Sequence, residues 1–210
     1  MNNNQTVEKL RQMRIGAMAE LHLQHVKNNT TESCTPDEYL AMLTDHEWES
    51  RQNQKTQRLI KQAAFRQKAS VEEVDFSPAR NLDKNMFSRL ATLDFIGRKE
   101  NLIVTGASGV GKSYLAQALG YQACFNGLKV YYSNTGRLFT RLKLSKTDGT
   151  YLKELKKLQK TNLLILDDFG LHPMNNHCRE TLMDIIDDRY KYTSTIIVSQ
   201  IPVSVWYDII

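Results

Sequence analysis

Residues 106–113, with the sequence GASGVGKS, constrain the fold of this chain more than any other segment. They match the pattern G-x-x-x-x-G-K-S at every position. The apolar run NLIVT precedes them directly, and the apolar, helix-compatible run YLAQALGYQA follows. A glycine-rich loop between a strand and a helix is the context in which this pattern binds phosphates. A chance glycine-rich turn is a poor alternative, because both the residues and their context agree.

The chemistry of this loop predicts ATP and Mg²⁺ as its ligands. Its backbone N–H groups curl round a β-phosphate, and the helix N-terminus adds a partial positive charge. Lys112 is predicted to bridge the β- and γ-phosphates, and the Ser113 hydroxyl to bind Mg²⁺. The predicted nucleotide-binding residues are Gly106, Ala107, Ser108, Gly109, Val110, Gly111, Lys112, Ser113 and Tyr114.

Two later apolar runs end in polar residues that are candidates for catalysis. Residues 163–168 read LLILDD, so a buried strand would deliver Asp167 to the Mg²⁺ site and Asp168 to the attacking water. A solvated acidic turn is the alternative, which the preceding phosphate loop disfavours. Residues 195–200, TIIVSQ, would place Ser199 and Gln200 near the γ-phosphate, although many strands end in such residues. The predicted catalytic residues are Lys112, Asp168, Ser199 and Gln200.

Short apolar segments alternate with helical patterns across the second part of the chain. The predicted strands are residues 101–105, 129–133, 163–166 and 195–199. This alternation predicts an α/β domain with a parallel sheet. The strand at 129–133 lies between the two motifs. It argues against the simplest nucleotide kinases and for nucleotide hydrolases with an acidic residue beside the Mg²⁺ aspartate.

The first part of the chain is predicted to be helical. Val7, Leu10, Ala17 and Leu21 have amphipathic helical spacing, and a polar break is expected over residues 27–33. The sequence TPDE at 35–38 then predicts a helix start with a capping box, opening a helix toward Phe65. We expect three regions: a helical domain over 1–70, a linker and start of the core over 71–98, and a nucleotide-binding domain over 99–210.

The net charge of +5 conceals two basic segments. Residues 51–68 contain six basic and no acidic residues, and residues 137–160 carry a net charge of +6. Each segment could bind backbone phosphates of DNA, or be merely a solvated helix face. The predicted DNA contacts are Arg51, Lys55, Arg58, Lys61, Arg66, Lys68, Arg141, Lys143 and Lys146.

The remaining composition points to a cytoplasmic protein without a membrane partner. No apolar run approaches the length of about 20 residues that spans a bilayer, and the N-terminal residues lack a signal-peptide core. Cys34, Cys124 and Cys178 are far apart in sequence, which excludes a disulfide framework and a CxxC metal site.

Together the motifs GASGVGKS, LLILDDFG and TIIVSQIPVSVWY resemble the IstB-type helper ATPases of bacterial insertion sequences. These are relatives of the DnaC helicase loader and the DnaA initiator in the AAA+ class. The segments MRIGAMAE, YLAMLTDHEWESRQNQKTQRLIKQAAF and VDFSPARNLDK are similar to that family's helical region and linker. The resemblance implies an ASCE-type AAA+ fold, ATP binding, slow hydrolysis, assembly as a homo-oligomer on double-stranded DNA, and a transposase of the same element as partner.

Two alternatives stay open beside this resemblance. A DnaC-like helicase loader has the same ATPase class, and an inactive truncated fragment is the other possibility. Such proteins continue beyond the residues 206–210 that end this sequence, and the resemblance implies that the continuation carries a last strand, a helix and an arginine acting on the neighbouring subunit. Arg189, before the last predicted strand, is available but is not assigned that role.

Overall fold

The computed structural model describes residues 3–28, 34–171 and 173–208. Most of the predicted polar break at 27–33, and the last two residues, lie outside this described part. The chain divides into two compact units, Met1–Gln57 and Arg58–Ile210. No helix of the described residues is long and apolar enough to cross a membrane.

The first unit contains helices α1 (Asn3–Gln12) and α2 (Gly16–Asn28) and most of α3 (Pro36–Ala63). The apolar spacing from Val7 to Leu21 is helical on both sides of a break that its periodicity did not reveal. Arg14 adopts a left-handed φ of 60°, and the N–H of Ile15 donates to the carbonyl of Leu10. This arrangement satisfies the end of α1 and starts a new helix direction.

The predicted start of α3 is confirmed. The backbone N–H and hydroxyl of Thr35 donate to the Glu38 carboxylate at 2.9 and 2.8 Å, and the Glu38 N–H donates back at 3.3 Å. These bonds satisfy donors that a helix N-terminus otherwise leaves free. The helix ends at Ala63 because Ala64 has a φ of 59°.

A four-stranded parallel sheet forms the centre of the second unit. Its strands are β1 (Leu102–Thr105), β2 (Val130–Asn134), β3 (Leu163–Phe169) and β4 (Ser194–Ser199), in the order β1-β4-β3-β2. All four predicted strands are therefore confirmed. The predicted end of β3 at Leu166 is too early, because the strand continues through Asp167 and Asp168 to Phe169.

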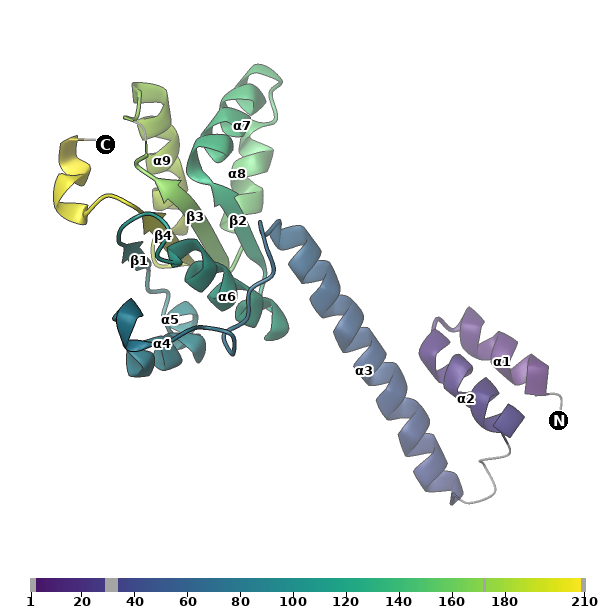
Figure 1. Cartoon of the computed structure of the whole chain (residues 1–210). Coiled ribbons are helices and arrows are strands. Elements are labelled where there is room, and N and C mark those ends of the chain that lie inside the picture. The colour runs from purple at the N-terminus through teal and green to yellow at the C-terminus, as the bar shows by residue number, and fades with distance from the viewer. Residues whose placement is uncertain (1–2, 29–33, 172, 209–210) are drawn as a thin grey trace. The chain divides into compact units, whose positions relative to one another are not determined.

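Helices cover both faces of this sheet (Figure 1). On one face, Leu163 and Ile165 pack in a core with α6 (Lys112–Phe125) and with α4 (Lys84–Ala91) and α5 (Asp94–Gly97). On the other, Leu164 and Leu166 pack with α7 (Thr135–Thr147), α8 (Tyr151–Gln159) and α9 (Asn176–Arg189). Two short 3-10 helices, η2 (Pro78–Arg80) and η3 (Val203–Asp208), complete the unit.

The fold brings the carboxyl ends of the strands together. Because β4 lies between β1 and β3, the loop that follows β1 is near the carboxyl ends of β4 and β3. In open parallel sheets, ligands bind at the carboxyl ends of the strands. The predicted site residues therefore converge at one edge of the sheet.

Candidate nucleotide-binding site

The predicted loop lies between a strand and a helix: residues 106–111 join β1 to α6, and the last two residues of the motif, Lys112 and Ser113, begin that helix. Gly109 and Gly111 have φ values of 79° and 93°, in the left-handed region that favours glycine. The Lys112 ammonium is buried within the loop and donates to the carbonyl of Ala107 at 2.6 Å. The loop is thus closed on its own lysine at the N-terminus of a 14-residue helix, an arrangement suited to anions.

Ser113 and Asp167, the two predicted Mg²⁺ ligands, lie side by side. The Ser113 hydroxyl donates to one Asp167 carboxylate oxygen at 2.9 Å, and the Tyr132 hydroxyl donates to the other at 2.6 Å. Asp167 is 1% exposed. Burial, with the hydrogen bond to Asp167, raises the pKa of Tyr132, so the phenol stays a donor. A hydroxyl and a carboxylate are oxygen ligands of the kind that Mg²⁺ prefers.

Asp168 occupies a special backbone position beside this pair. Its φ is 54°, and the pairing of β3 with β4 shifts register between Leu166 and Phe169. A non-glycine residue in this region is uncommon, and such residues occur at functional sites. The Asn134 amide at the end of β2 donates to the Asp168 carboxylate at 2.8 Å, while the Asn134 side-chain oxygen caps α7.

Ser199 and Gln200 at the end of β4 differ in their surroundings. The Ser199 hydroxyl is fully buried, donates to the carbonyl of Phe169 at 2.8 Å and accepts from the N–H of Ile201 at 3.0 Å. It is therefore engaged in joining β4 to β3. Gln200 is exposed and lines the same polar pocket as Lys112 and Asp168.

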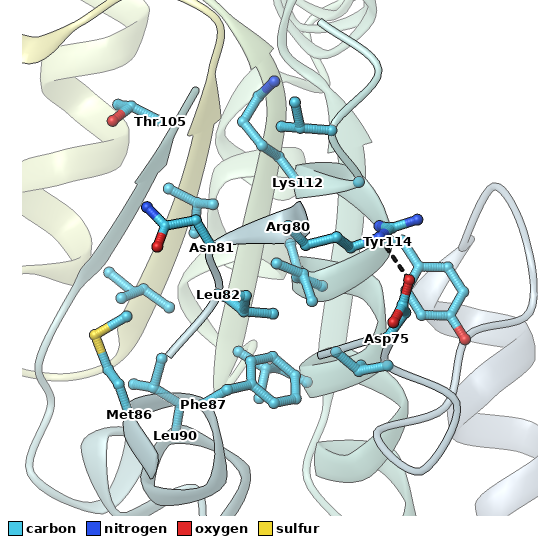
Figure 2. A pocket seen from close by; sticks show the side chains of 18 of the residues that line it. Asp75, Arg80, Asn81, Leu82, Met86, Phe87, Leu90, Thr105, Lys112 and Tyr114 are labelled. Carbon is cyan, nitrogen blue, oxygen red and sulfur yellow. Dashed lines mark ion pairs between the residues drawn. The ribbon is translucent and has the colours of Figure 1, made fainter. Parts of the chain in front are cut away.

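A second cavity, of about 710 Å³, lies on the other side of the phosphate loop. Figure 2 shows Leu82, Met86, Phe87 and Leu90 along it, with Lys112 at the opposite end. Apolar side chains of β1 and α6 complete its walls. It is within the size range of small-molecule sites.

Sequence reasoning missed this cavity because its apolar residues come from separate segments and share no periodic pattern. Arg80 lies at its edge and pairs with Asp75 at 2.9 Å (Figure 2). Its guanidinium would be 3.2 Å from a Cβ at Gly111, so this glycine also permits a close approach of the segment before β1. Tyr114 lines both the apolar cavity and the polar pocket.

The predicted DNA contacts fall into three groups. Lys55, Arg58 and Lys61 are exposed on α3, whereas Arg51 pairs with Glu47 at 2.7 Å and donates to a backbone carbonyl of the first unit. Arg66 and Lys68 follow the end of α3, and Arg66 lines the polar pocket beside the phosphate loop.

The third group lies on α7. Arg141 contacts Tyr131 and pairs with Glu154 at 3.3 Å, so its charge is already partly compensated. Lys143 and Lys146 are exposed, and the Lys146 ammonium lies 4.6 Å from the centre of the Tyr151 ring. The two lysines are therefore the accessible members of this group.

Arg189 has a structural role within its own unit. It is 3% exposed and donates to the backbone carbonyls of Leu158 and Thr161 at 2.6 and 3.0 Å, and also to that of Ser194. Burial lowers the pKa of this guanidinium to about 10. These bonds link the ends of α8 and α9 to the start of β4.

Comparison with solved structures defines the class of the fold. The chain is similar to the DnaC helicase loader, with 27% identity and a TM-score of 0.56 over 67% of this chain and 82% of that one. DnaI has the same fold, with 23% identity and a TM-score of 0.59 over 68% of this chain and 78% of that one. The second unit is thus a P-loop AAA+ domain of the DnaC and DnaA type.

The sequence profile described as "IstB-like ATP binding protein" matches residues 8–210. The chain belongs to this family. It is 40% identical to an insertion-sequence ATP-binding protein of Sinorhizobium fredii, covering 98% of this chain and 84% of that protein. It is 38% identical to the ATP-binding protein of insertion sequence IS1162 from Pseudomonas fluorescens, covering 97% and 89%.

Proposed function

We propose that this protein binds ATP with Mg²⁺ at the phosphate loop and acts as a helper of insertion-sequence transposition. One observation carries the ATP assignment: the polar pocket and the apolar cavity adjoin across Gly109, Gly111, Lys112 and Tyr114. A nucleotide needs both environments, a polar one for its phosphates and an apolar one for its base. The base would lie among the side chains of α4 and β1.

The residues present fit a magnesium ion. When bound, Mg²⁺ would neutralise charge on the β- and γ-phosphate oxygens. Ser113 and Asp167 would hold it, since their oxygens are already within 2.9 Å of one another. Tyr132 fixes the second oxygen of Asp167, which leaves a single orientation of that carboxylate toward the pocket.

Asp168 is the best candidate to orient a water molecule for ATP hydrolysis. Its carboxylate lines the polar pocket, and Asn134 holds it from the side of β2. Asp is one methylene shorter than Glu, so slow turnover is expected. Gln200 is the better candidate for contact with the γ-phosphate, because the Ser199 hydroxyl is used within the fold.

The partners follow from the family and from charge. Relatives named as insertion-sequence ATP-binding proteins support a role in insertion-sequence transposition, and we extend this role to double-stranded DNA and the transposase of the same element as partners. Exposed Lys55, Arg58 and Lys61 on α3, and Lys143 and Lys146 on α7, supply cations for DNA phosphates. Assembly as a homo-oligomer on DNA is part of this proposal.

Equilibrium titration with a fluorescent ATP analogue tests the assignment. Lys112→Ala should abolish detectable binding, and Lys9→Ala, an exposed lysine of α1, should match the parent protein. In the parent, ATP at about one hundred times its Kd should add about 2.7 kcal/mol to the free energy of unfolding. Equal binding by Lys112→Ala and parent would remove the ATP assignment.

A DnaC-like helicase loader is the second candidate, favoured by the likeness to the DnaC structure. Pull-down from a mixture of a purified replicative helicase and a purified insertion-sequence transposase distinguishes the two candidates. Capture of the transposase supports the transposition helper. Capture of the helicase alone supports the loader.

A further inference from the structure

Arg66 lies on a short segment, residues 64–70, that crosses the helix following the phosphate loop. The N–H groups of Arg66 and Gln67 donate to the Gln117 side-chain oxygen at 2.8 and 3.2 Å. Gln117 is fully buried on α6, and its own amide donates to the carbonyl of Ser113 at 3.1 Å. The backbone at Arg66 is therefore tied, through one side chain, to the first turn of α6.

Contacts on both sides of Arg66 hold the segment in place. Before it, the Phe65 ring stacks on Tyr121 with a centroid distance of 4.3 Å. After it, Ala69 is buried, and the Ser70 N–H donates to the Tyr114 hydroxyl at 3.2 Å. A backbone fixed at three points limits the region that the Arg66 side chain can reach.

That region is the polar pocket of the phosphate loop. Arg66 lines it together with Lys112, Ser113, Asp167 and Asp168. Arg66 therefore lies in the same pocket as the predicted Mg²⁺ ligands.

The Arg66 guanidinium is available for a ligand. In the described part of the chain it forms no ion pair or side-chain hydrogen bond, whereas Arg80, on the other side of the loop, is paired with Asp75. Arg66 is exposed, so a ligand can reach it without displacing a packed side chain. Its planar group presents donors in a geometry that matches phosphate oxygens.

We propose that Arg66 binds the terminal phosphate of ATP from within the same chain and so makes the site prefer ATP over ADP. This inference rests on the proposed ATP site and deepens it. The pocket already holds two carboxylates, Asp167 and Asp168, which repel a γ-phosphate. A second cation beside Lys112 offsets that repulsion where the additional phosphate of ATP would lie.

Titration of fluorescent ATP and ADP analogues with the full chain tests the proposal. Arg66→Ala should weaken ATP binding about tenfold to a hundredfold, the range expected for losing charged hydrogen bonds. ADP affinity should change by less than about threefold, a shift within the error of such comparisons. Arg66→Lys, which keeps the charge but not the planar donors, should fall between. Arg98→Ala is the matched control, because Arg98 is exposed before β1, at the opposite end of that strand from the loop.

Three outcomes decide against the proposal. Equal losses for ATP and ADP would mean that Arg66 only supports the fold of the pocket. Unchanged ATP binding with weaker nucleotide-free DNA binding would make Arg66 a DNA contact. In both cases the parent protein still binds ATP, so the proposed site stands. If the parent binds neither nucleotide, the proposed site and this inference fail together.

Discussion

Gly120→Ala tests the packing that holds residues 64–70, the segment that contains Arg66, against α6 within the second unit. A Cβ at this position of α6 would lie 2.7 Å from Cε1 of Phe65 and 2.9 Å from Cδ1 of Ile165. Both distances are far below van der Waals contact. The Phe65 ring is stacked on Tyr121, and Ile165 is fully buried in β3, so neither has free space to move into.

The expected magnitude follows from two opposing effects. Alanine in a helix interior gains about 1 kcal/mol over glycine. Overpacking of a filled core costs about 1–3 kcal/mol per inserted group, and two clashes place this case at the upper end. We expect a net loss of about 1–2 kcal/mol, which lowers Tm by about 2–8 °C for a unit of this size.

Urea and thermal unfolding measure this effect, with Gly97→Ala as the control. Gly97 lies in the same unit, and a Cβ at this position would meet no other part of the fold within 4 Å. Its substitution by alanine should therefore leave Tm unchanged or raise it slightly. Phe65→Leu combined with Gly120→Ala should recover part of the loss, because the two side chains compete for one space. A Gly120→Ala protein as stable as the parent would refute the packing argument and the part of the Arg66 anchoring that depends on Phe65.

Two further predictions concern the carboxylates and the thiols. Asn134→Asp keeps the acceptor that caps α7 but removes the donor to Asp168. The rate of ATP hydrolysis should therefore fall at least about tenfold, the scale of a misplaced general base, while ATP affinity stays near that of the parent. An unchanged rate would exclude Asp168 from the chemistry. Burial raises the pKa of Cys124 to about 12, so at pH 8 about one thiol in ten thousand is ionised. In a Cys34→Ser, Cys178→Ser protein, reaction with a disulfide reagent should therefore follow unfolding, and rapid labelling of the native state would contradict this burial.

Local patterns carried most of the successful prediction of the fold. The strand and helix on either side of residues 106–111, the capping box before α3 and the four apolar strands depend on neighbouring residues, and the structure confirms each of them. In a parallel sheet the carboxyl ends of all strands lie at the same edge. The order of the motifs along the chain was therefore enough to predict that Ser113 approaches Asp167. The break at Arg14 was hidden because apolar residues keep helical spacing on both sides of it.

Contacts between distant segments account for what the sequence did not reveal. The apolar cavity joins Leu82 and residues of α4 to β1 and α6, which no single periodicity connects. The two bonds of the Ser199 hydroxyl depend on how β4 sits beside the end of β3. The residue types made Ser199 and Gln200 candidates for the site. Only the register of the sheet determines which of the two side chains is free to contact a ligand.

Arg66 shows how backbone direction can override a charge pattern. It belongs by sequence to the basic run of 51–68, and spacing along one continuous helix would assign it to DNA with Lys55 and Arg58. The helix ends at Ala63 because Ala64 takes a left-handed φ of 59°, and the chain then turns across α6. Leu59 and Ala63 before this turn and Ala69 after it are buried in the core of the second unit, so the turn is anchored on both sides. The backbone angle at Ala64 therefore places Arg66 in the polar pocket and not on the surface of α3. The ratio of ATP to ADP affinity in Arg66→Ala, compared with that of the parent, measures whether Arg66 acts on the nucleotide.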